Sequence, residues 1–257
     1  MRLLQLNAWS IRLAIRVEDM VKKEAPDIIT LQEVFDSESD MGLFPGLSQV
    51  AADLHFHHQY FSPVYGLQFM GRQAEFGNAT LSNLTFGDKY TEFTNLEYKD
   101  NLMFDEDDYN VRNFQHVVVH DENNQPIHVI NHHGYHVPGH KKGNDFTLKA
   151  CQQIIDYALK LGGPVIIAGD FNLEPDSESM NVINSHFRNL TSEYGLMSTR
   201  TNLTHKDEPC DYIFVNNQVK VENFYASDIV ASDHQGLVLD FEVSPLSIDS
   251  EAGTSNK

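Results

Sequence analysis

Cysteine and long apolar runs are both scarce in this chain. It has only two cysteines, Cys151 and Cys210, in 257 residues, which excludes the disulfide framework of a small secreted domain. No apolar run approaches the ~20 residues that a membrane helix needs, so no membrane span is expected. The first residues lead straight into a predicted strand without the apolar segment of a secretory signal, and we therefore expect a cytoplasmic protein.

Positive charge is also scarce. The chain carries 18 Lys and Arg against 37 Asp and Glu, a formal net charge of -19. Binding to duplex DNA usually depends on several Lys or Arg side chains that neutralise phosphates, so tight duplex binding is not expected. A small phosphoester or a short single-stranded nucleic acid is a more compatible partner, because bound divalent cations reverse the field locally. The charge by itself is equally compatible with simple solubility.

The sequence contains no linker rich in Pro, Gly or Ser between Leu3 and Phe241. We therefore expect a single domain over residues 1–244, and a chain of this length buries a core without disulfides or metals. Small polar residues fill positions 245–257, which predicts a disordered tail. The sequence does not fix the oligomeric state, and a monomer is favoured.

Apolar periodicity predicts alternating strands and helices. Strands are expected at 3–6, 28–31, 58–65, 78–82, 93–98, 117–119, 127–130, 165–168, 211–215, 219–225 and 236–243. Helices are expected at 11–24, 47–54, 145–161 and 177–184, the last with Ser177 as its N-cap, and an acidic surface loop at 101–110. Since several strands are joined by hairpins, mixed sheets with helices outside are expected, although periodicity alone leaves a doubly wound sheet possible.

Four polar islands lie at or near the ends of apolar runs. They are Leu-Asn7-Ala-Trp, Leu-Gln-Glu33-Val, Gly-Asp170-Phe-Asn172 and Ser-Asp233-His234. Strand ends are places where a rigid scaffold holds polar groups over a pocket. Oxygen ligands of this kind suit Mg²⁺ or Mn²⁺ better than Zn²⁺. The pattern therefore predicts a hydrolytic site built around a hard divalent metal ion.

In order and wording these islands resemble the endonuclease/exonuclease/phosphatase superfamily of metal-dependent phosphoesterases. The resemblance runs from Leu4 to about Phe241, with Cys210-Asp211-Tyr-Ile-Phe-Val in the matching gap. It implies an α/β fold, a four-layer sandwich of two packed mixed β-sheets flanked by helices. It also implies Mg²⁺- or Mn²⁺-dependent hydrolysis of a phosphoester, as by a phosphodiesterase or nuclease, through a metal-activated water. It does not name the substrate, because this superfamily cuts DNA, RNA, phosphoinositides, sphingomyelin and protein–DNA adducts on one scaffold.

The resemblance implies a metal set and two substrate contacts. Glu33 matches the principal metal ligand of the family, and Asn7 and Asp233 are expected to complete the metal shell directly or through water. Asn78, in Gly-Asn-Ala, matches an Asn that reaches toward the scissile phosphate. Arg112 matches an Arg often found before the next strand, although it could equally pair with the acidic loop.

The resemblance also implies five catalytic residues. Asp170 matches the residue that orients or deprotonates the attacking water, and Asn172 the one that holds the phosphate or that Asp. His234 is expected to donate to a phosphoryl oxygen and to be oriented by Asp211, an arrangement that stabilises developing negative charge. His133 takes the place of a phosphate-contacting His.

Other interpretations stay open. His132, His133, His136 and His140 invite a zinc site, although their spacing matches no structural zinc pattern and no Cys is near. Gly134 stands where the family has a larger apolar residue, so the register in which this segment matches the family motif stays open. The alternatives to a phosphodiesterase or nuclease are a phosphatase of a small phosphorylated molecule, such as an inositol phosphate or lipid headgroup, and a non-catalytic protein that binds a phosphorylated ligand. One or two metal ions are both possible.

A short basic stretch stands out in this acidic chain. Lys141, Lys142 and Lys149 are opposed in their segment only by Asp145. The stretch predicts either a phosphate-facing loop or an ordinary solvated surface.

Overall fold

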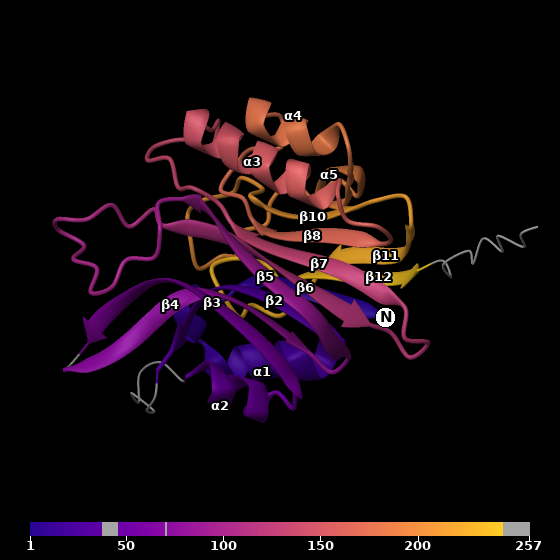
Figure 1. The fold of residues 1–257 in the computed structure, drawn as a ribbon, viewed down its shortest axis with the longest axis horizontal. Helices are drawn as coiled ribbons and strands as arrows, with labels where there is room; N and C mark the ends of the chain where they lie inside the picture. The colour runs from indigo at the N-terminus through magenta and orange to yellow at the C-terminus, as the bar shows by residue number, and fades with distance from the viewer. Residues whose placement is uncertain (38–45, 70, 244–257) are drawn as a thin grey trace, which may run out of the picture.

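The computed structural model describes residues 1–37, 46–69 and 71–243. Figure 1 shows the arrangement of the elements. In chain order they are β1 (Arg2–Asn7), η1 (Trp9–Ile11), α1 (Ala14–Glu24), β2 (Ile28–Asp36), α2 (Leu47–Asp53), β3 (His58–Phe69), β4 (Arg72–Ser82), β5 (Thr85–Asn95), β6 (Arg112–His120), β7 (Pro126–His133), α3 (Asp145–Ala158), β8 (Val165–Asp170), α4 (Glu178–Asn184), β9 (Arg188–Asn189), α5 (Leu190–Glu193), β10 (Asp211–Val215), β11 (Val219–Ala226) and β12 (Leu237–Val243).

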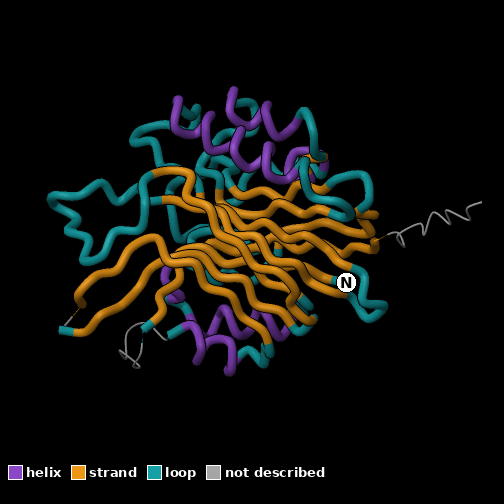
Figure 2. Tube along the Cα trace, viewed as in Figure 1, coloured by secondary structure: helices purple, strands orange, loops and turns teal. Residues whose placement is uncertain are grey.

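The strands form two six-stranded sheets, in the orders β11-β12-β1-β2-β4-β3 and β5-β6-β7-β8-β10-β9. Each sheet is mixed: β1 and β2 are parallel, as are β7 and β8, and the other pairs are antiparallel. The parallel pairs are joined through helices, as parallel strands require. Figure 2 shows α1 and α2 on one outer side and α3, α4 and α5 on the other. The predicted four-layer sandwich is confirmed.

Three apolar cores hold the layers together. One packs α1 and α2 against the first sheet, and another packs α3 and α4 against the second. The third lies between the sheets, where Leu3, Ile28 and Leu239 of the first sheet meet Val129 and Ile166 of the second. The strands that face two layers are buried on both faces, which explains why apolar residues follow one another directly in β1, β2 and β8.

A buried polar layer also joins the two sheets. Gln32 of β2 accepts from Gln5 at 2.8 Å and donates to Asn131 of β7 at 2.7 Å. Asn131 donates in turn to the carbonyls of Leu31 and Ala79. Because the buried amides are hydrogen-bonded, the layer fixes the relative placement of the sheets rather than destabilising the core.

Most predicted elements are confirmed with shifted ends. Ser177 caps α4 as predicted, its side chain accepting from the Met180 amide at 3.3 Å. The helix predicted from residue 11 instead begins at Ala14, because Trp9, Ser10 and Ile11 adopt left-handed φ angles.

The strand predicted at 93–98 was misplaced, since β5 covers Thr85–Asn95. This edge strand is largely exposed and polar, so it has no apolar signal, and its pairing with β6 defines it. The short β9 and α5 were not predicted. The tail predicted to be disordered, 245–257, lies outside the described residues. Within the described part of the chain, no helix has the length and apolar character needed to cross a membrane.

A histidine pair on the second sheet predicts acid lability. His116 Nε2 lies 2.9 Å from His128 Nδ1, and His116 Nδ1 lies 2.8 Å from the Tyr157 hydroxyl. Burial, with the neighbouring His128, lowers the pKa of His116 from 6.5 to about 4. Between pH 6.5 and about 4, His116 binds a proton in the unfolded chain but not in the native state. The free energy of unfolding therefore decreases as the pH falls through this range.

We expect His116→Gln to reduce the stability difference between pH 7.5 and pH 5 by about 2 kcal/mol. Urea unfolding at the two pH values measures it. His57→Gln, at an exposed position, is the matched control. An unchanged pH dependence in the His116 variant would contradict the prediction.

Candidate active site

The topology brings polar strand ends together at one end of the sandwich. The parallel strands β1 and β2 carry Asn7 and Glu33 at or near their carboxyl ends, and the parallel strands β7 and β8 end in His133 and Asp170. The antiparallel neighbour β10 begins at the same edge, with Asp211 opposite Asp170. A cavity of about 300 Å³ opens there.

A β-bulge sets the direction of Glu33. The register between β2 and β4 shifts between Leu31 and Val34, so an extra residue of β2 turns out of the regular alternation. Glu33 itself has a φ of 56°, in the left-handed region that non-glycine residues seldom adopt. Backbone strain of this kind clusters at functional positions, and here it places the Glu33 carboxylate on the cavity wall.

Asn7 ties together carboxylates from the two sheets. Its Nδ2 donates to Glu33 Oε1 and to Asp170 Oδ2, both at 3.1 Å. Its Oδ1 accepts from the Trp9 amide at 3.1 Å, which fixes the orientation of the side-chain amide. In this geometry Asn7 holds the two carboxylates close together, and its assignment as a metal ligand stays a prediction.

Close packing of β7 on β8 places His133 beside Asp170. Gly169 has a φ of 153°, and a Cβ there would lie 1.9 Å from the His132 carbonyl oxygen, so this position of the Gly-Asp motif requires glycine. His133 Nε2 lies 3.8 Å from Glu33 Oε1 and 3.9 Å from Asp170 Oδ2. Burial, with the nearby Arg112, lowers the pKa of His133 well below its usual value, although Asp170 opposes this shift.

Asn172 holds Asp170 from the loop after β8. Its backbone amide donates to Asp170 Oδ1 at 2.8 Å, and its Nδ2 donates to the Gly134 carbonyl at 3.3 Å. A Cβ on Gly134 would lie 2.2 Å from the Phe171 carbonyl oxygen. The unusual glycine is therefore required by this contact.

Lys141 contributes to the interior of the site rather than to a surface loop. Its Nζ donates to Asn172 Oδ1, and the residue is buried, whereas its neighbour Lys142 is exposed. The interpretation as a solvated surface was therefore wrong for Lys141, and the interpretation as a phosphate-facing loop stays a prediction. The sequence shows that Lys141 is charged but not that its side chain is buried in the site. That placement depends on the contact with Asn172 in the loop after β8.

His234 and Asp211 form a buried pair. His234 Nδ1 lies 2.8 Å from one oxygen of Asp211 and 3.0 Å from the other. Thr199 Oγ1 also donates to Asp211, at 2.7 Å. Burial opposes a charge on His234, but Asp211 and Asp170 outweigh it and raise the pKa of the ring. Nε2 of His234 lies 3.7 Å from Asp170 Oδ2, on the cavity wall.

Asp170 is ionised despite its burial. Desolvation alone would raise its pKa, but His234 and His133, together with Arg200, bring the pKa well below its usual range. A carboxylate with so low a pKa is a weak base. Low basicity favours orienting a water molecule over deprotonating one.

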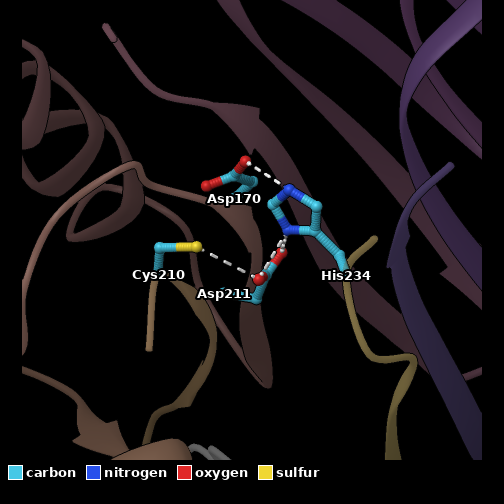
Figure 3. A group of neighbouring side chains, drawn as sticks. All are labelled: Asp170, Cys210, Asp211 and His234. Atoms are coloured by element: carbon cyan, nitrogen blue, oxygen red, sulfur yellow. Dashed lines mark hydrogen bonds and ion pairs between the residues drawn. The ribbon is translucent and has the colours of Figure 1, made fainter. Parts of the chain in front are cut away.

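Figure 3 shows Asp170, Cys210, Asp211 and His234 together. Their ligand atoms lie within 4.8 Å of one another, so this buried group could hold a metal ion. Its chemistry favours proton handling instead. Burial, with Asp211, raises the pKa of the Cys210 thiol well above its usual value, so the thiol stays protonated and donates to Asp211 at 3.4 Å.

The donor set beside this group fits a hard cation better. Glu33 is desolvated, and this burial raises its pKa. Among the described residues no Lys or Arg forms an ion pair with Glu33, whose only such contact is His133 at 3.8 Å. The Glu33 carboxylate, held beside Asp170 without a Lys or Arg partner among the described residues, suits a bound divalent ion with oxygen ligands.

Asp233, Arg112 and Asn78 differ in their relation to the cavity. Asp233 and Arg112 line it, whereas Asn78 does not. Asn78 is buried in the amide layer between the sheets, its Nδ2 donating to Asn113 Oδ1 at 2.9 Å. Arg112 donates to the carbonyls of Gly134, Tyr109 and Val111, so its hydrogen bonds hold the cavity wall. The roles of Asn78 and Arg112 as substrate contacts stay predictions.

Arg200 is a residue of the site that the sequence did not reveal. It precedes β10 without any motif of its own, yet its Nη1 contacts His234 Nε2 and lies 3.5 Å from Asp233 Oδ2. The full cavity wall combines acidic, basic and aromatic side chains: Trp9, Glu33, Tyr65, Phe76, Tyr109, Arg112, His133, His136, Asp170, Asn172, Arg200, Lys206, Asp233 and His234.

The four histidines proposed for zinc do not converge. His132 and His133 point to opposite faces of β7, as successive strand residues do, and His132 packs on Phe171. His136 lies against Tyr109, and His140 is exposed. No group of three or more potential ligands in the described part of the chain includes any of the four, so the zinc interpretation was wrong.

Comparison with known proteins agrees with this geometry. The model of the Endonuclease/Exonuclease/phosphatase family matches residues 4–234. No curated protein matches the chain significantly.

Solved structures with the same fold cover nearly the whole chain. An endonuclease/exonuclease/phosphatase from Beutenbergia cavernae is 17% identical, with a TM-score of 0.75, over 95% of this chain and 71% of that one. The mannosyl-6-phosphatase Bt3783 of Bacteroides thetaiotaomicron is 15% identical, with a TM-score of 0.66, over 94% and 99%. The human Nocturnin catalytic domain is 16% identical, with a TM-score of 0.66, over 95% and 94%. The chain belongs to the endonuclease/exonuclease/phosphatase family of metal-dependent phosphoester hydrolases.

Proposed function

We propose that this protein is a Mg²⁺- or Mn²⁺-dependent hydrolase that cleaves a phosphoester in a small molecule or a short single-stranded nucleic acid. The observation that carries the proposal is the meeting of Glu33, Asp170 and His234 at one cavity, with Asn7 hydrogen-bonded to Glu33 and Asp170 from the two sheets. Glu33 would hold the metal, with Asp170 beside it and Asp233 on the same wall. The cytoplasmic location expected from the sequence remains part of the proposal.

The side chains have complementary tasks in this hydrolysis. A bound divalent ion supplies Lewis acidity and makes water a better nucleophile. Asp170, fixed by the Asn172 amide and by Asn7, orients the attacking water. His234, held by Asp211, donates to the phosphoryl oxygen on which negative charge develops. His133, buried on the cavity wall, offers a further hydrogen bond to the phosphate.

A substrate screen with metal removal tests the proposal. Purified protein is assayed with Mg²⁺ or Mn²⁺ against a chromogenic phosphodiester, a chromogenic phosphomonoester, single-stranded and abasic DNA, RNA and inositol phosphates. We expect turnover of at least one short substrate, its loss in excess EDTA, and recovery on adding back Mg²⁺ or Mn²⁺. Activity that survives EDTA would contradict the metal requirement. Phosphate binding without any turnover would favour the non-catalytic alternative.

Long duplex DNA is expected to be a poor ligand. The net charge of -19 repels a polyanion, and duplex affinity depends on neutralising several phosphates at once. We expect gel shifts at physiological salt to detect only weak binding of duplex DNA. A short single-stranded substrate should still be turned over at that salt concentration. Tight duplex binding at that salt without metal would contradict the charge argument and favour a repair nuclease.

A phosphatase acting on a small phosphorylated molecule is the second candidate. The cavity is small, about 300 Å³, and its wall includes three basic side chains, Arg112, Arg200 and Lys206. Such a pocket suits one terminal phosphate better than a polymer backbone. One structural relative is a mannosyl-6-phosphatase, which supports this candidate.

A further inference from the structure

Arg200 has an unusual environment for a buried cation. Its side chain is only 4% exposed, it lines the cavity, and its Nε is buried without a hydrogen-bond partner among the described residues. An unsatisfied buried donor is costly, and more so on a charged group. A guanidinium cannot avoid this cost by losing its proton. The missing partner is therefore expected to be an acceptor that enters the cavity.

The backbone around Arg200 is fixed against the His234 segment. Arg200 and His234 face each other in an isolated antiparallel bridge. The Gln235 amide donates to the Thr199 carbonyl at 2.8 Å, and the Thr201 amide donates to the Asp233 carbonyl at 3.0 Å. The guanidinium is thus preorganised rather than carried on a loose loop, which reduces the entropy lost on binding a ligand.

The contact between Arg200 and His234 marks a position for an oxyanion. Arginine has donors only, so its Nη1 can meet His234 Nε2 only as donor to acceptor. An oxygen with negative charge that enters the cavity would take the place of Nε2 as the acceptor of Arg200.

Charge counting favours a dianion. The cavity wall carries three basic side chains, Arg112, Arg200 and Lys206, against three carboxylates, Glu33, Asp170 and Asp233. With the three histidines of the wall, His133, His136 and His234, counted as neutral, a divalent ion at Glu33, which the proposed function requires, leaves two net positive charges. A phosphomonoester dianion matches that charge, whereas a phosphodiester carries only one negative charge.

Oxygen counting leads to the same ligand. A phosphomonoester has three non-bridging oxygens, and the site offers three places for them: the Glu33 side, the histidine side and Arg200. A diester has only two such oxygens, and its second ester group would face the unsatisfied Arg200 donor. Leaving a buried polar group unpaired is a strong basis for discrimination.

We propose that Arg200 is a specificity-determining residue that binds a non-bridging oxygen of a terminal phosphate and thereby selects phosphomonoesters over phosphodiesters. This inference rests on the proposed function for its reaction, but it concerns recognition and can be tested by binding alone. The alternative is a structural role, in which Arg200 only neutralises Asp233 and holds His234 in position.

Kinetics with two aryl esters separate these roles. Wild type, Arg200→Gln and Arg200→Lys are assayed with Mn²⁺ on p-nitrophenyl phosphate and on methyl p-nitrophenyl phosphate, which share a leaving group. We expect Arg200→Gln to lower kcat/KM about 100-fold on the monoester and less than about tenfold on the diester. Arg200→Lys keeps the positive charge but lacks the planar arrangement of donors. Its kcat/KM on the monoester should therefore lie between those of wild type and Arg200→Gln. Lys160→Gln, at an exposed position outside the cavity wall, makes the same charge change and should alter the ratio less than about threefold.

Binding gives a readout without turnover. Calorimetry in Mg²⁺ should show inorganic phosphate bound by wild type at least about 30-fold more tightly than by Arg200→Gln, and dimethyl phosphate bound weakly by both. Circular dichroism and Tm check that each variant is folded; if Arg200→Gln is not, Arg200→Lys alone carries the comparison. Equal losses on the two esters, or phosphate binding unchanged in the variants, would overturn the proposal even if hydrolysis is confirmed. Arg200-dependent phosphate binding without hydrolysis would support it while the proposed function fails.

Discussion

Replacing Glu33 by Gln is expected to lower metal-dependent kcat/KM about 10⁴-fold while leaving the protein folded. Glu33 is desolvated and forms no ion pair with Lys or Arg in the described part of the chain. In the metal-free protein, no Lys or Arg of the described residues therefore compensates the negative charge of Glu33. A bound metal cation would compensate it. Gln preserves the shape and the hydrogen bond to Asn7 but removes that charge.

Two measurements separate loss of metal binding from loss of folding. Mg²⁺ should raise the Tm of wild type by mass action, and this rise should disappear in Glu33→Gln. Without metal, the variant should be at least as stable as wild type, because a partly desolvated carboxylate without a Lys or Arg partner among the described residues has been removed. Asp36→Asn, on the same strand, is the matched control, since Asp36 accepts from the Leu47 amide and does not line the cavity. Full activity of Glu33→Gln would end the metal assignment.

The catalytic motifs could be located from sequence because each lies at the end of a strong apolar run. Leu3–Leu6 before Asn7 is apolar except for Gln5, and Val165–Ala168 before Asp170 is a continuous apolar segment. Both are fully buried in strands. Parallel pairing then brings their carboxyl ends to one edge. What the pattern could not supply was the bulge that turns Glu33 toward the cavity, because a bulge depends on the partner strand β4.

Residues whose roles depend on distant contacts were missed. Arg200 becomes part of the site only because residues 199–201 pair with residues 232–235, more than thirty positions away in the chain. Lys141 was noticed for its charge, but its contact with Asn172 follows from the packing of two loops. Asn78 shows the converse. Its motif was found, yet its side chain is engaged in the amide layer between the sheets, where local sequence gives no signal.

Asp211→Asn is expected to lower kcat/KM about 10³-fold with little change in fold. Asp211 accepts from His234 Nδ1 at 2.8 Å and from Thr199 Oγ1 at 2.7 Å, so it sets both the orientation and the tautomer of the ring. An amide in its place can present a donor to Nδ1. The ring would then carry its proton on Nε2 in the ground state but could not stabilise a positive charge as the phosphate gains negative charge.

A double-mutant cycle tests whether the two residues act as one unit. His234→Gln alone should lower kcat/KM by about 10³-fold, since it removes one donor to the developing charge. If Asp211 acts only through His234, the Asp211→Asn and His234→Gln double variant should be no slower than the slower single variant, because residues that work as a unit are not additive. Asp240→Asn provides the control, since Asp240 pairs with Arg2 away from the cavity. This variant should retain wild-type kcat/KM.

Multiplicative losses in the double variant would show that Asp211 contributes separately, as a ligand in the Asp170, Cys210, Asp211 and His234 group would. That outcome would move the metal from Glu33 toward the cluster in Figure 3.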